Sequence, residues 1–379
     1  MSRNAELVLI LAYAGRQLAA AARAASFRPL VIDRFGDRDT RDIAHEFHSL
    51  PCDERGAIDG AAVVALVTQL RATYGAVPLV WGGGLEASHA LLSKLEASGP
   101  VLGTVLTGVR ELIDPVLTRD ALDALAIPHP AIALTPQSTP GWLRKRRGGS
   151  GGGHVQDHQP AEPLGDDDYL QRRVAGPVHS LTFVAAAEGC EGLSFNRHHN
   201  LQPDPGAFYR YGGACTVTTV PPLIAAACLR HAHALTARFG LRGLCGFDFV
   251  LTGNATIQLI DINPRPTSTF DLGVTPASAF AAHMAACRGS AVPLVQQMAC
   301  QGQVIYYASD AIQIPNWLDW PPWVADRPHP GTRVAKGDPL CTLAAAGRDA
   351  DEAVARLRER MAWLQQTLHG AGADPAIVQ

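Results

Sequence analysis

The sequence has almost no excess charge of either sign and no long hydrophobic run. Its 32 Lys and Arg residues against 35 Asp and Glu give a formal net charge of −3 over 379 residues. Such a chain has no basic field to attract nucleic acid or an anionic membrane. No uninterrupted apolar stretch reaches the roughly 18 residues of a membrane-spanning helix. We therefore expect neither nucleic acid nor a membrane as a partner.

Cysteine pairs are lacking too. The eight cysteines form no CxxC sequence and no cluster with the spacing of zinc ligands. Scattered thiols in a chain of this size indicate a reducing compartment, so we expect a cytoplasmic protein. The apolar run at 7–11 faintly resembles a signal peptide, but it is short and Gly15-Arg16 interrupts the segment. A buried strand followed by a helix explains the same residues.

Two nucleotide-binding signatures are also missing. No GxGxxG motif follows the first apolar segment, and no GKS or GKT sequence closes a P-loop. Binding of a nicotinamide dinucleotide therefore has little support. Hydrophobic residues make up 47% of the chain and charged residues 18%, which is typical of globular proteins. The length predicts two or three domains.

The N-terminal third has the pattern of a parallel sheet. Short apolar segments at 6–12, 30–33 and 78–81 alternate with helical stretches. Gly15, Asp33 and the glycine triplet at 82–84 follow these segments, where ligands of such sheets bind. The triplet is either a bare turn or a loop at which substrate approaches the backbone.

Beyond residue 100 the pattern is mixed. A single helix is predicted across 104–126, and Ile127-Pro128-His129-Pro130 ends it. Residues 136–165 shift to Thr, Pro, Gly, Arg and acids. The later predicted elements are strands at 169–174, 180–186, 244–251 and 256–262, and helices at 219–239 and 351–368.

The most informative segment is a predicted hairpin at 246–265. Two apolar strands flank a glycine-containing turn at 252–254. Asp261 and Asn263 are two residues apart, so their side chains share one face, and Asp248 should lie across from them. Two carboxylates and an amide are oxygen ligands of the kind that Mg²⁺ prefers.

The acids of this hairpin have a structural alternative, a solvated strand with ordinary surface charges. Phe249, Ile260 and Ile262 flank them, however, and a lone charge is costly in so apolar a strand. Arg265 follows directly, between two prolines. A guanidinium there could neutralise a transferring phosphoryl group or an acyl-phosphate.

A second informative segment runs from Trp142 to Val155. A basic run precedes the sequence Gly149, Ser150, Gly151, Gly152 and Gly153. A flexible linker would have such glycines, and a targeting or nucleic-acid-binding segment would have such a basic run. The functional alternative is a mobile flap whose backbone N–H groups cover nucleotide phosphates, with Lys145 contacting them from the preceding strand.

Taken in order, these features resemble the ATP-grasp family. The order of the features carries the resemblance: a strand lysine, a glycine flap, an apolar strand beginning at Tyr169, and then the DFV and DINPR sequences. The resemblance spans about 12–275. It is closest to the carboxylate–amine ligases related to biotin carboxylase. It implies an α/β ATP-grasp fold with a preATP-grasp parallel-sheet domain at 1–103, a lid subdomain at 104–180, a metal-binding lobe at 181–290, and a C-terminal β-element with a closing helix at 291–379.

The resemblance also implies a site for ATP and Mg²⁺, with Mn²⁺ as a substitute. Asp248, Asp261 and Asn263 match the family's metal ligands, and Arg265 matches the arginine of its NPR signature. The phosphate-contacting positions match Lys145 and Gly149 to Gly153. Gln171 and Arg172 fall where the family's chain passes the adenine.

Three positions depart from the family pattern. Asp261 stands where Glu is usual, which puts a second metal ion in doubt. Arg172 replaces the acid that often follows the hinge glutamine. The upstream lysine that usually meets the phosphates is missing, and Arg110 and Arg119 are alternative substitutes between which the sequence does not choose.

Three further segments have both a structural and a functional interpretation. His179, His198 and His199 are surface or core histidines, or they bind a substrate carboxylate or transfer a proton near the nucleotide. Adjacent strand histidines point to opposite faces, which argues against a metal pair at 198 and 199. The segment 208–213 either walls a substrate pocket or is a plain loop.

The activity implied is an ATP-dependent carbon–nitrogen ligase that converts a small carboxylic acid to an acyl-phosphate and passes the acyl group to an amine. Related proteins are often homodimers, and some occur in pathways that build one-carbon carrier cofactors such as methanofuran and tetrahydromethanopterin. One alternative is a nucleotide-binding regulatory or scaffold protein with a degenerate site, which the missing lysine favours. Another is a grasp enzyme that transfers phosphate without ligation, or that makes carboxyphosphate.

Overall fold

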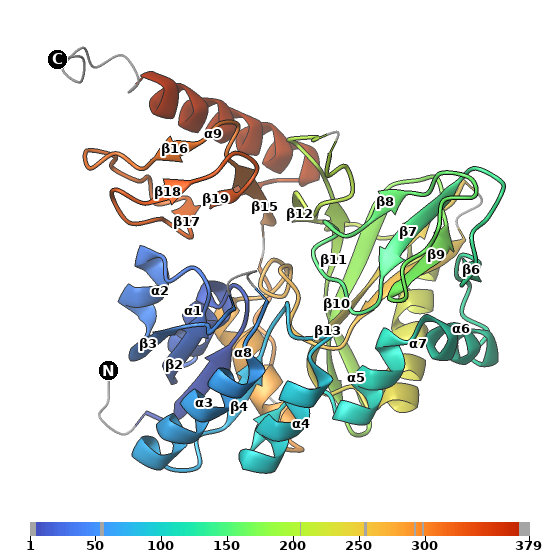
Figure 1. The fold of residues 1–379 in the computed structure, drawn as a ribbon, viewed down its shortest axis with the longest axis horizontal. Helices are drawn as coiled ribbons and strands as arrows, with labels where there is room; N and C mark the ends of the chain where they lie inside the picture. The colour runs from blue at the N-terminus through green and yellow to red at the C-terminus, as the bar shows by residue number, and fades with distance from the viewer. Residues whose placement is uncertain are drawn as a thin grey trace.

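The computed structural model describes residues 5–53, 57–204, 206–253, 256–291, 293–297 and 299–370, and Figure 1 shows its arrangement. The N-terminal part is a five-stranded parallel sheet in the order β3 (Glu46–Ser49), β2 (Arg28–Asp33), β1 (Leu7–Leu11), β4 (Leu79–Trp81) and β5 (Val101–Leu102). Its helices are α1 (Arg16–Ala24), α2 (Arg38–Ile43), α3 (Gly60–Tyr74) and α4 (His89–Ser98). The central strands are fully buried, as their near-continuous apolar sequences predict.

The helix predicted across 104–126 is in fact two helices, α5 (Leu106–Ile113) and α6 (Pro115–Ala124). Pro115 has no N–H to continue the first helix, and it drives the preceding residue out of the helical region. Asp114 is extended accordingly and caps α6, because its carboxylate accepts hydrogen bonds from the N–H groups of Val116 and Leu117.

A four-stranded antiparallel sheet follows, with the order β6 (Ile132–Ala133), β9 (Asp168–Arg172), β7 (Trp142–Arg146) and β8 (Gln156–Asp157). The glycine-rich segment is the connection between β7 and β8. This small sheet stands beside the edge of the larger sheet in Figure 1. We refer to residues 131–172 as the lid.

The largest sheet has eight strands, β14 (Ile257–Asn263), β13 (Gly243–Leu251), β10 (Val178–Ala186), β11 (Gly189–His198), β12 (Gly213–Thr216), β15 (Cys300–Tyr307), β19 (Pro339–Gly347) and β17 (Val324–Ala325), in that order. Helix α7 (Pro222–Phe239) shares one hydrophobic core with Phe247 and Phe249. Helix α8 (Pro276–Cys287) shares another with α1 of the N-terminal part. The sheet is therefore covered by helices on both faces and joined to the N-terminal part through α8.

The C-terminal segment completes this sheet instead of standing apart. Strands β15 and β19 pair along their whole length, and α9 (Ala350–Gly370) packs on them. A two-stranded ladder of β16 (Ile312–Gln313) and β18 (Arg333–Val334) lies beside them. The proposed boundary between 290 and 291 thus falls just before a strand of the same continuous sheet.

Ion pairs join this C-terminal segment to the N-terminal part. Arg16 at the start of α1 pairs with Asp326 at 2.8 Å, and Arg327 pairs with Asp39 of α2. His329 contacts the carbonyl oxygen of Gly36 at 3.1 Å. The carboxyl ends of β1 and β2 are consequently held close to the loop that follows β17.

Two predictions from composition can be compared with the structure. All eight cysteines are free thiols. No helix among the described residues is long and apolar enough to cross a bilayer. Asn254 of the predicted hairpin turn lies outside the described residues.

Candidate active site

The predicted hairpin is present as β13 and β14, and its acids face each other. Asp248 pairs directly with Asp261, and Asn263 pairs with Gly246. Cross-strand partners of an antiparallel pair project from the same face, so the two carboxylates and the amide are brought together as predicted. Among the described residues no three His, Cys, Asp or Glu side chains form a metal-binding group. A metal at this place would therefore need the oxygen of Asn263 as its third side-chain ligand.

The electrostatics of this carboxylate pair suit a bound cation. Burial raises the pKa of Asp248 well above its ordinary value, and the charge of Asp261 raises it further. Lys145 and Arg265 oppose this rise but do not cancel it. Two facing carboxylates thus need a proton or a cation between them, and an oxygen donor set of this kind fits Mg²⁺.

A β-bulge lies directly beside the pair. Asp248 is opposite Asp261 but Phe249 is opposite Leu259, so Ile260 is left over in β14. The carbonyl oxygen of Ile260 accepts hydrogen bonds from Lys145 Nζ at 3.1 Å and from Gln171 Nε2 at 3.3 Å. Both donors come from the lid. The bulge thereby ties the lid to the strand that carries Asp261.

The glycine segment packs closely against neighbouring backbone. A Cβ on Gly152 would lie 2.0 Å from the carbonyl oxygen of Tyr209, and one on Gly148 would lie 2.7 Å from Cβ of Ala87. Both glycines have positive φ, at 73° and 64°. The N–H of Tyr211 donates to the carbonyl oxygen of Gly151 at 2.9 Å. We call residues 148–153 the flap; a free linker would not make such contacts.

The flap also brings in a histidine that the sequence analysis did not consider. His154 follows the flap directly, and its ring would be 2.5 Å from a Cβ on Gly149. Burial lowers its pKa, and the nearby charge of Asp261 acts in the opposite direction. The signal available in the sequence was its place at the end of a glycine run.

Arg265 is held by a partner from the N-terminal sheet. Its Nε donates to Glu86 Oε1 at 2.5 Å, while Glu86 Oε2 accepts from the N–H of Gly84 at 2.7 Å. The two side chains are only 10% and 9% exposed. The triplet at 82–84 is therefore a contact surface for Arg265, because a Cβ on Gly83 would lie 3.4 Å from the guanidinium carbon. Sequence analysis missed Glu86, although it lies only two residues after Gly84.

The remaining predicted positions are more peripheral. Arg172 donates to the carbonyl oxygen of Pro140, and its guanidinium lies over the ring of Trp142, so it serves the lid's own structure. Arg119 pairs with its neighbour Asp120. Asp114, besides capping α6, pairs with Arg147 at the base of the flap at 3.1 Å.

Two polar side chains lie beside Asp248 without a hydrogen bond. His198 Nε2 is 3.8 Å from Asp248 Oδ1, and the ring of Tyr211 meets that of His198 edge to face with the centroids 5.5 Å apart. Burial raises the pKa of Tyr211 to about 12 and lowers that of His198 to about 4, so both are uncharged near neutral pH in the absence of a ligand.

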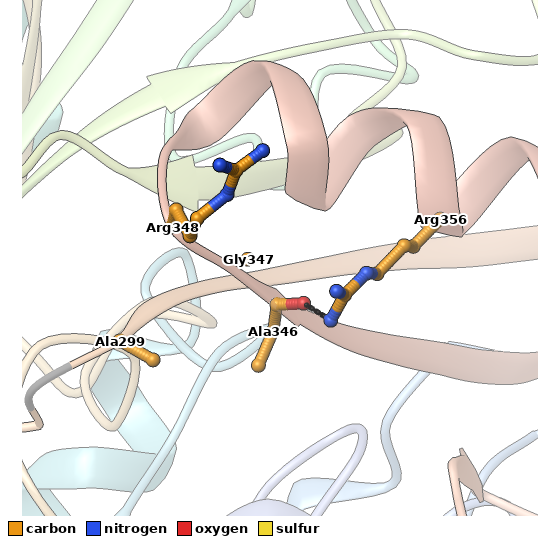
Figure 2. Close-up of a pocket in the computed structure, with 5 residues that line it drawn as sticks. All are labelled: Ala299, Ala346, Gly347, Arg348 and Arg356. Carbon is orange, nitrogen blue, oxygen red and sulfur yellow. Dashed lines mark hydrogen bonds between the residues drawn. The ribbon is translucent and has the colours of Figure 1, made fainter.

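A surface hollow drawn in Figure 2 is lined by none of the predicted site residues. It measures about 360 Å³ and is lined by Ala299, Ala346, Gly347, Arg348 and Arg356. Arg348 and Arg356 both pair with Glu352, and Arg356 also donates to the carbonyl oxygen of Ala346. Because its cations already have partners, we assign no ligand to it.

This architecture, a parallel-sheet domain, a small lid and a large antiparallel sheet with facing acids, is the ATP-grasp fold. Residues 113–269 match the family model described as "ATP-grasp domain", so the chain carries an ATP-grasp domain and the resemblance seen in the sequence is confirmed. No curated protein sequence matches the chain.

Solved structures share the fold at low sequence identity. The biotin carboxylase domain dimer of Hydrogenobacter thermophilus 2-oxoglutarate carboxylase, in complex with MgADP, ADP and bicarbonate, matches with a TM-score of 0.73 and 11% identity, over 93% of this chain and 88% of that one. Biotin carboxylase from Campylobacter jejuni, as a β-γ-ATP complex, gives 0.71 and 11%, over 92% and 89%. N5-carboxyaminoimidazole synthetase from Staphylococcus aureus, complexed with ADP, gives 0.70 and 13%, over 95% and 98%.

Proposed function

We propose that the protein is an ATP-dependent carboxylate–amine ligase that works through an acyl-phosphate. The observation that carries the proposal is the facing pair of Asp248 and Asp261, with Asn263 on the same face and the flap beside them. The neighbours solved with ADP or MgADP support nucleotide and Mg²⁺ as its ligands. A bound Mg²⁺ would neutralise phosphate charge during transfer.

In the first step a carboxylate oxygen of the acid attacks the γ-phosphorus of ATP. The bond from that phosphorus to the β–γ bridging oxygen breaks, and ADP leaves. Asp248, Asp261 and Asn263 would hold the metal, and the flap N–H groups would orient the phosphates for in-line attack. Lys145 would reach the phosphates by exchanging its hydrogen bond to Ile260 for a phosphate oxygen, a stronger charge-assisted partner.

In the second step the amine nitrogen attacks the acyl carbon. The bond from that carbon to the phosphate oxygen breaks, inorganic phosphate leaves, and the amine's proton passes to solvent. Arg265 would stabilise the charge on the acyl-phosphate, oriented by its hydrogen bond to Glu86. Flap closure would keep water away from the acyl-phosphate.

The test is an ADP-release assay of the purified chain against pooled carboxylic acids and amines. Asp261→Asn should lower acid-dependent ADP release by at least about a hundredfold, because the metal loses a carboxylate. Asp319→Asn, which alters an exposed acid between β16 and β17, is the matched control. Unchanged turnover in Asp261→Asn would refute the proposed metal site.

A second candidate is a nucleotide-binding regulatory protein with a degenerate site. It is favoured by the engagement of Lys145 with a backbone carbonyl and by the surface pairing of Arg119. Such a protein would bind ADP in calorimetry but release none from ATP with any acid. We further propose that the protein is a cytoplasmic homodimer that acts in the biosynthesis of a one-carbon carrier cofactor. Light scattering would test the dimer, and an ADP-release assay with the acids of that pathway would test the biosynthetic role.

A further inference from the structure

His198 and Tyr211 each bury a polar atom in an energetically unfavourable state. Among the residues that the structure describes, neither His198 Nε2 nor the Tyr211 hydroxyl has a hydrogen-bond partner, although both atoms are buried. Nearly all buried polar atoms in proteins are paired, and each unpaired one costs about 1–3 kcal/mol. Two such atoms on touching rings indicate a ligand that supplies the missing partners.

The location of these two atoms restricts what that ligand can be. His198 is two residues from Asn196, which pairs with Ser180, and Ser180 in turn pairs with Asp248. His198 therefore projects from the same sheet face as Asp248. At 3.8 Å the distance from His198 Nε2 to Asp248 Oδ1 is too long for a hydrogen bond. A ligand bound to His198 would thus lie against the proposed metal ligands.

The flap covers the same place. The N–H of Tyr211 binds the carbonyl oxygen of Gly151, and the Tyr307 hydroxyl donates to the carbonyl oxygen of Tyr211 at 2.8 Å. The backbone of Tyr211 is therefore fixed from two sides. Ser268 and Gln303 lie close enough to the Tyr211 hydroxyl to lower its pKa as weak partners, but neither contact has hydrogen-bond geometry. A ligand that contacts the Tyr211 hydroxyl would consequently lie under the flap, near the transferring phosphate.

The two groups suit an oxygen acceptor. A phenol donates its O–H, and an imidazole whose proton is on Nε2 donates that N–H. Neither group is a permanent cation, so neither would be taken up by an ion pair with Asp248. Both therefore remain available to the ligand. A carboxylate takes two donors on its two oxygens, and the proposed reaction needs a carboxylate next to the γ-phosphate.

We propose that His198 Nε2 and the Tyr211 hydroxyl bind the carboxylate of the acid substrate beside Asp248. This inference rests on the proposed function, since it identifies where that reaction's acid binds. It also makes Tyr211 a link between acid and nucleotide, because the same residue holds the flap through its backbone. Binding of the acid and closure of the flap should then favour each other.

The test uses acetate as the probe and the full-length chain labelled with ¹³C at histidine Cε1. The His198 resonance is identified by its loss in His198→Asn, and acetate is titrated with and without MgADP. We expect the resonance to shift saturably with acetate but not with acetamide or methylammonium. Tyr211→Phe should weaken apparent acetate affinity by about tenfold or more, while ADP affinity in calorimetry stays within about twofold, since one hydrogen bond to a charged group is lost.

One variant serves as a matched control. Tyr209→Phe removes a neighbouring hydroxyl that instead contacts Asp157. It should leave the acetate response unchanged. A His198 resonance unmoved by acetate in both titrations, or an acetate affinity that Tyr211→Phe does not alter, overturns the inference. Failure of the proposed function is seen separately, as absence of ADP binding or of acid-dependent ADP release.

Discussion

Replacing Glu86 by Gln gives the sharpest stability prediction. The Glu86–Arg265 pair is about nine-tenths buried, and its partners are 179 residues apart in the chain. Removing one charge from a buried pair costs about 3–5 kcal/mol, because the other is left uncompensated. Gln keeps an oxygen that can accept from Arg265, so we expect the lower end, about 3 kcal/mol.

Chemical denaturation measures this cost directly. At roughly 2 °C per kcal/mol for a large chain, it also predicts a melting temperature lower by about 6 °C. Glu188→Gln, at an exposed turn position, is the control and should change stability by less than about 0.5 kcal/mol. A cycle with Arg265→Gln should show that the double variant costs less than the sum of the single variants.

The refuting result is a small effect. If Glu86→Gln costs less than about 1 kcal/mol, the pair behaves like an exposed salt bridge. Arg265 would then not depend on the N-terminal sheet for its position. The same outcome would leave the proposed orientation of Arg265 by Glu86 without support.

Three further predictions concern the flap, a buried acid and the metal. Gly152→Ala should raise the KM for ATP at least about tenfold in the ADP-release assay, because its Cβ would strike the Tyr209 carbonyl, whereas Gly153→Ala, with no neighbour within 4 Å of its Cβ, should not. Burial raises the pKa of Asp33 to about 6, so the folded state binds the proton of Asp33 more tightly than the unfolded state does. The contribution of Asp33 to the free energy of unfolding should therefore fall as pH rises from about 4 to 6, which chemical denaturation at several pH values would measure. Asp33→Asn should lack this pH dependence. Removal of divalent metal with EDTA should abolish ADP release, and Mn²⁺ should restore it; activity that persists in EDTA would contradict the proposed role of Asp248.

Local sequence patterns predicted much of the fold and of the site. The hairpin acids could be placed opposite each other because alternation and a short turn determine their register. The N-terminal strands were recognisable from short apolar segments that end in glycine or acid. The break at Asp114 was also readable from Pro115, and the prediction of one helix was wrong because the helical pattern across 104–126 was given more weight than the proline.

Contacts between distant segments could not be predicted in this way. Nothing in the local sequence pairs Glu86 with Arg265, or joins β12 to β15 across the interval that contains α7 and the hairpin. The position of His198 beside Asp248 depends on the register of three strands. Such contacts follow from global packing, which short-range periodicity does not encode.

The bulge at Ile260 has a consequence for the strand that carries Asp261. Leu259 is buried in the core with Phe249, and in a regular strand a residue two positions later would point into that core as well. The extra residue shifts the alternation of side chains between the two faces by one, so that Asp261 and Asn263 point away from the hydrophobic core. The position of Asp261 therefore depends on the bulge: if Ile260 paired regularly with Asp248, Asp261 would lie opposite Phe247 and point into the core, with no change of sequence.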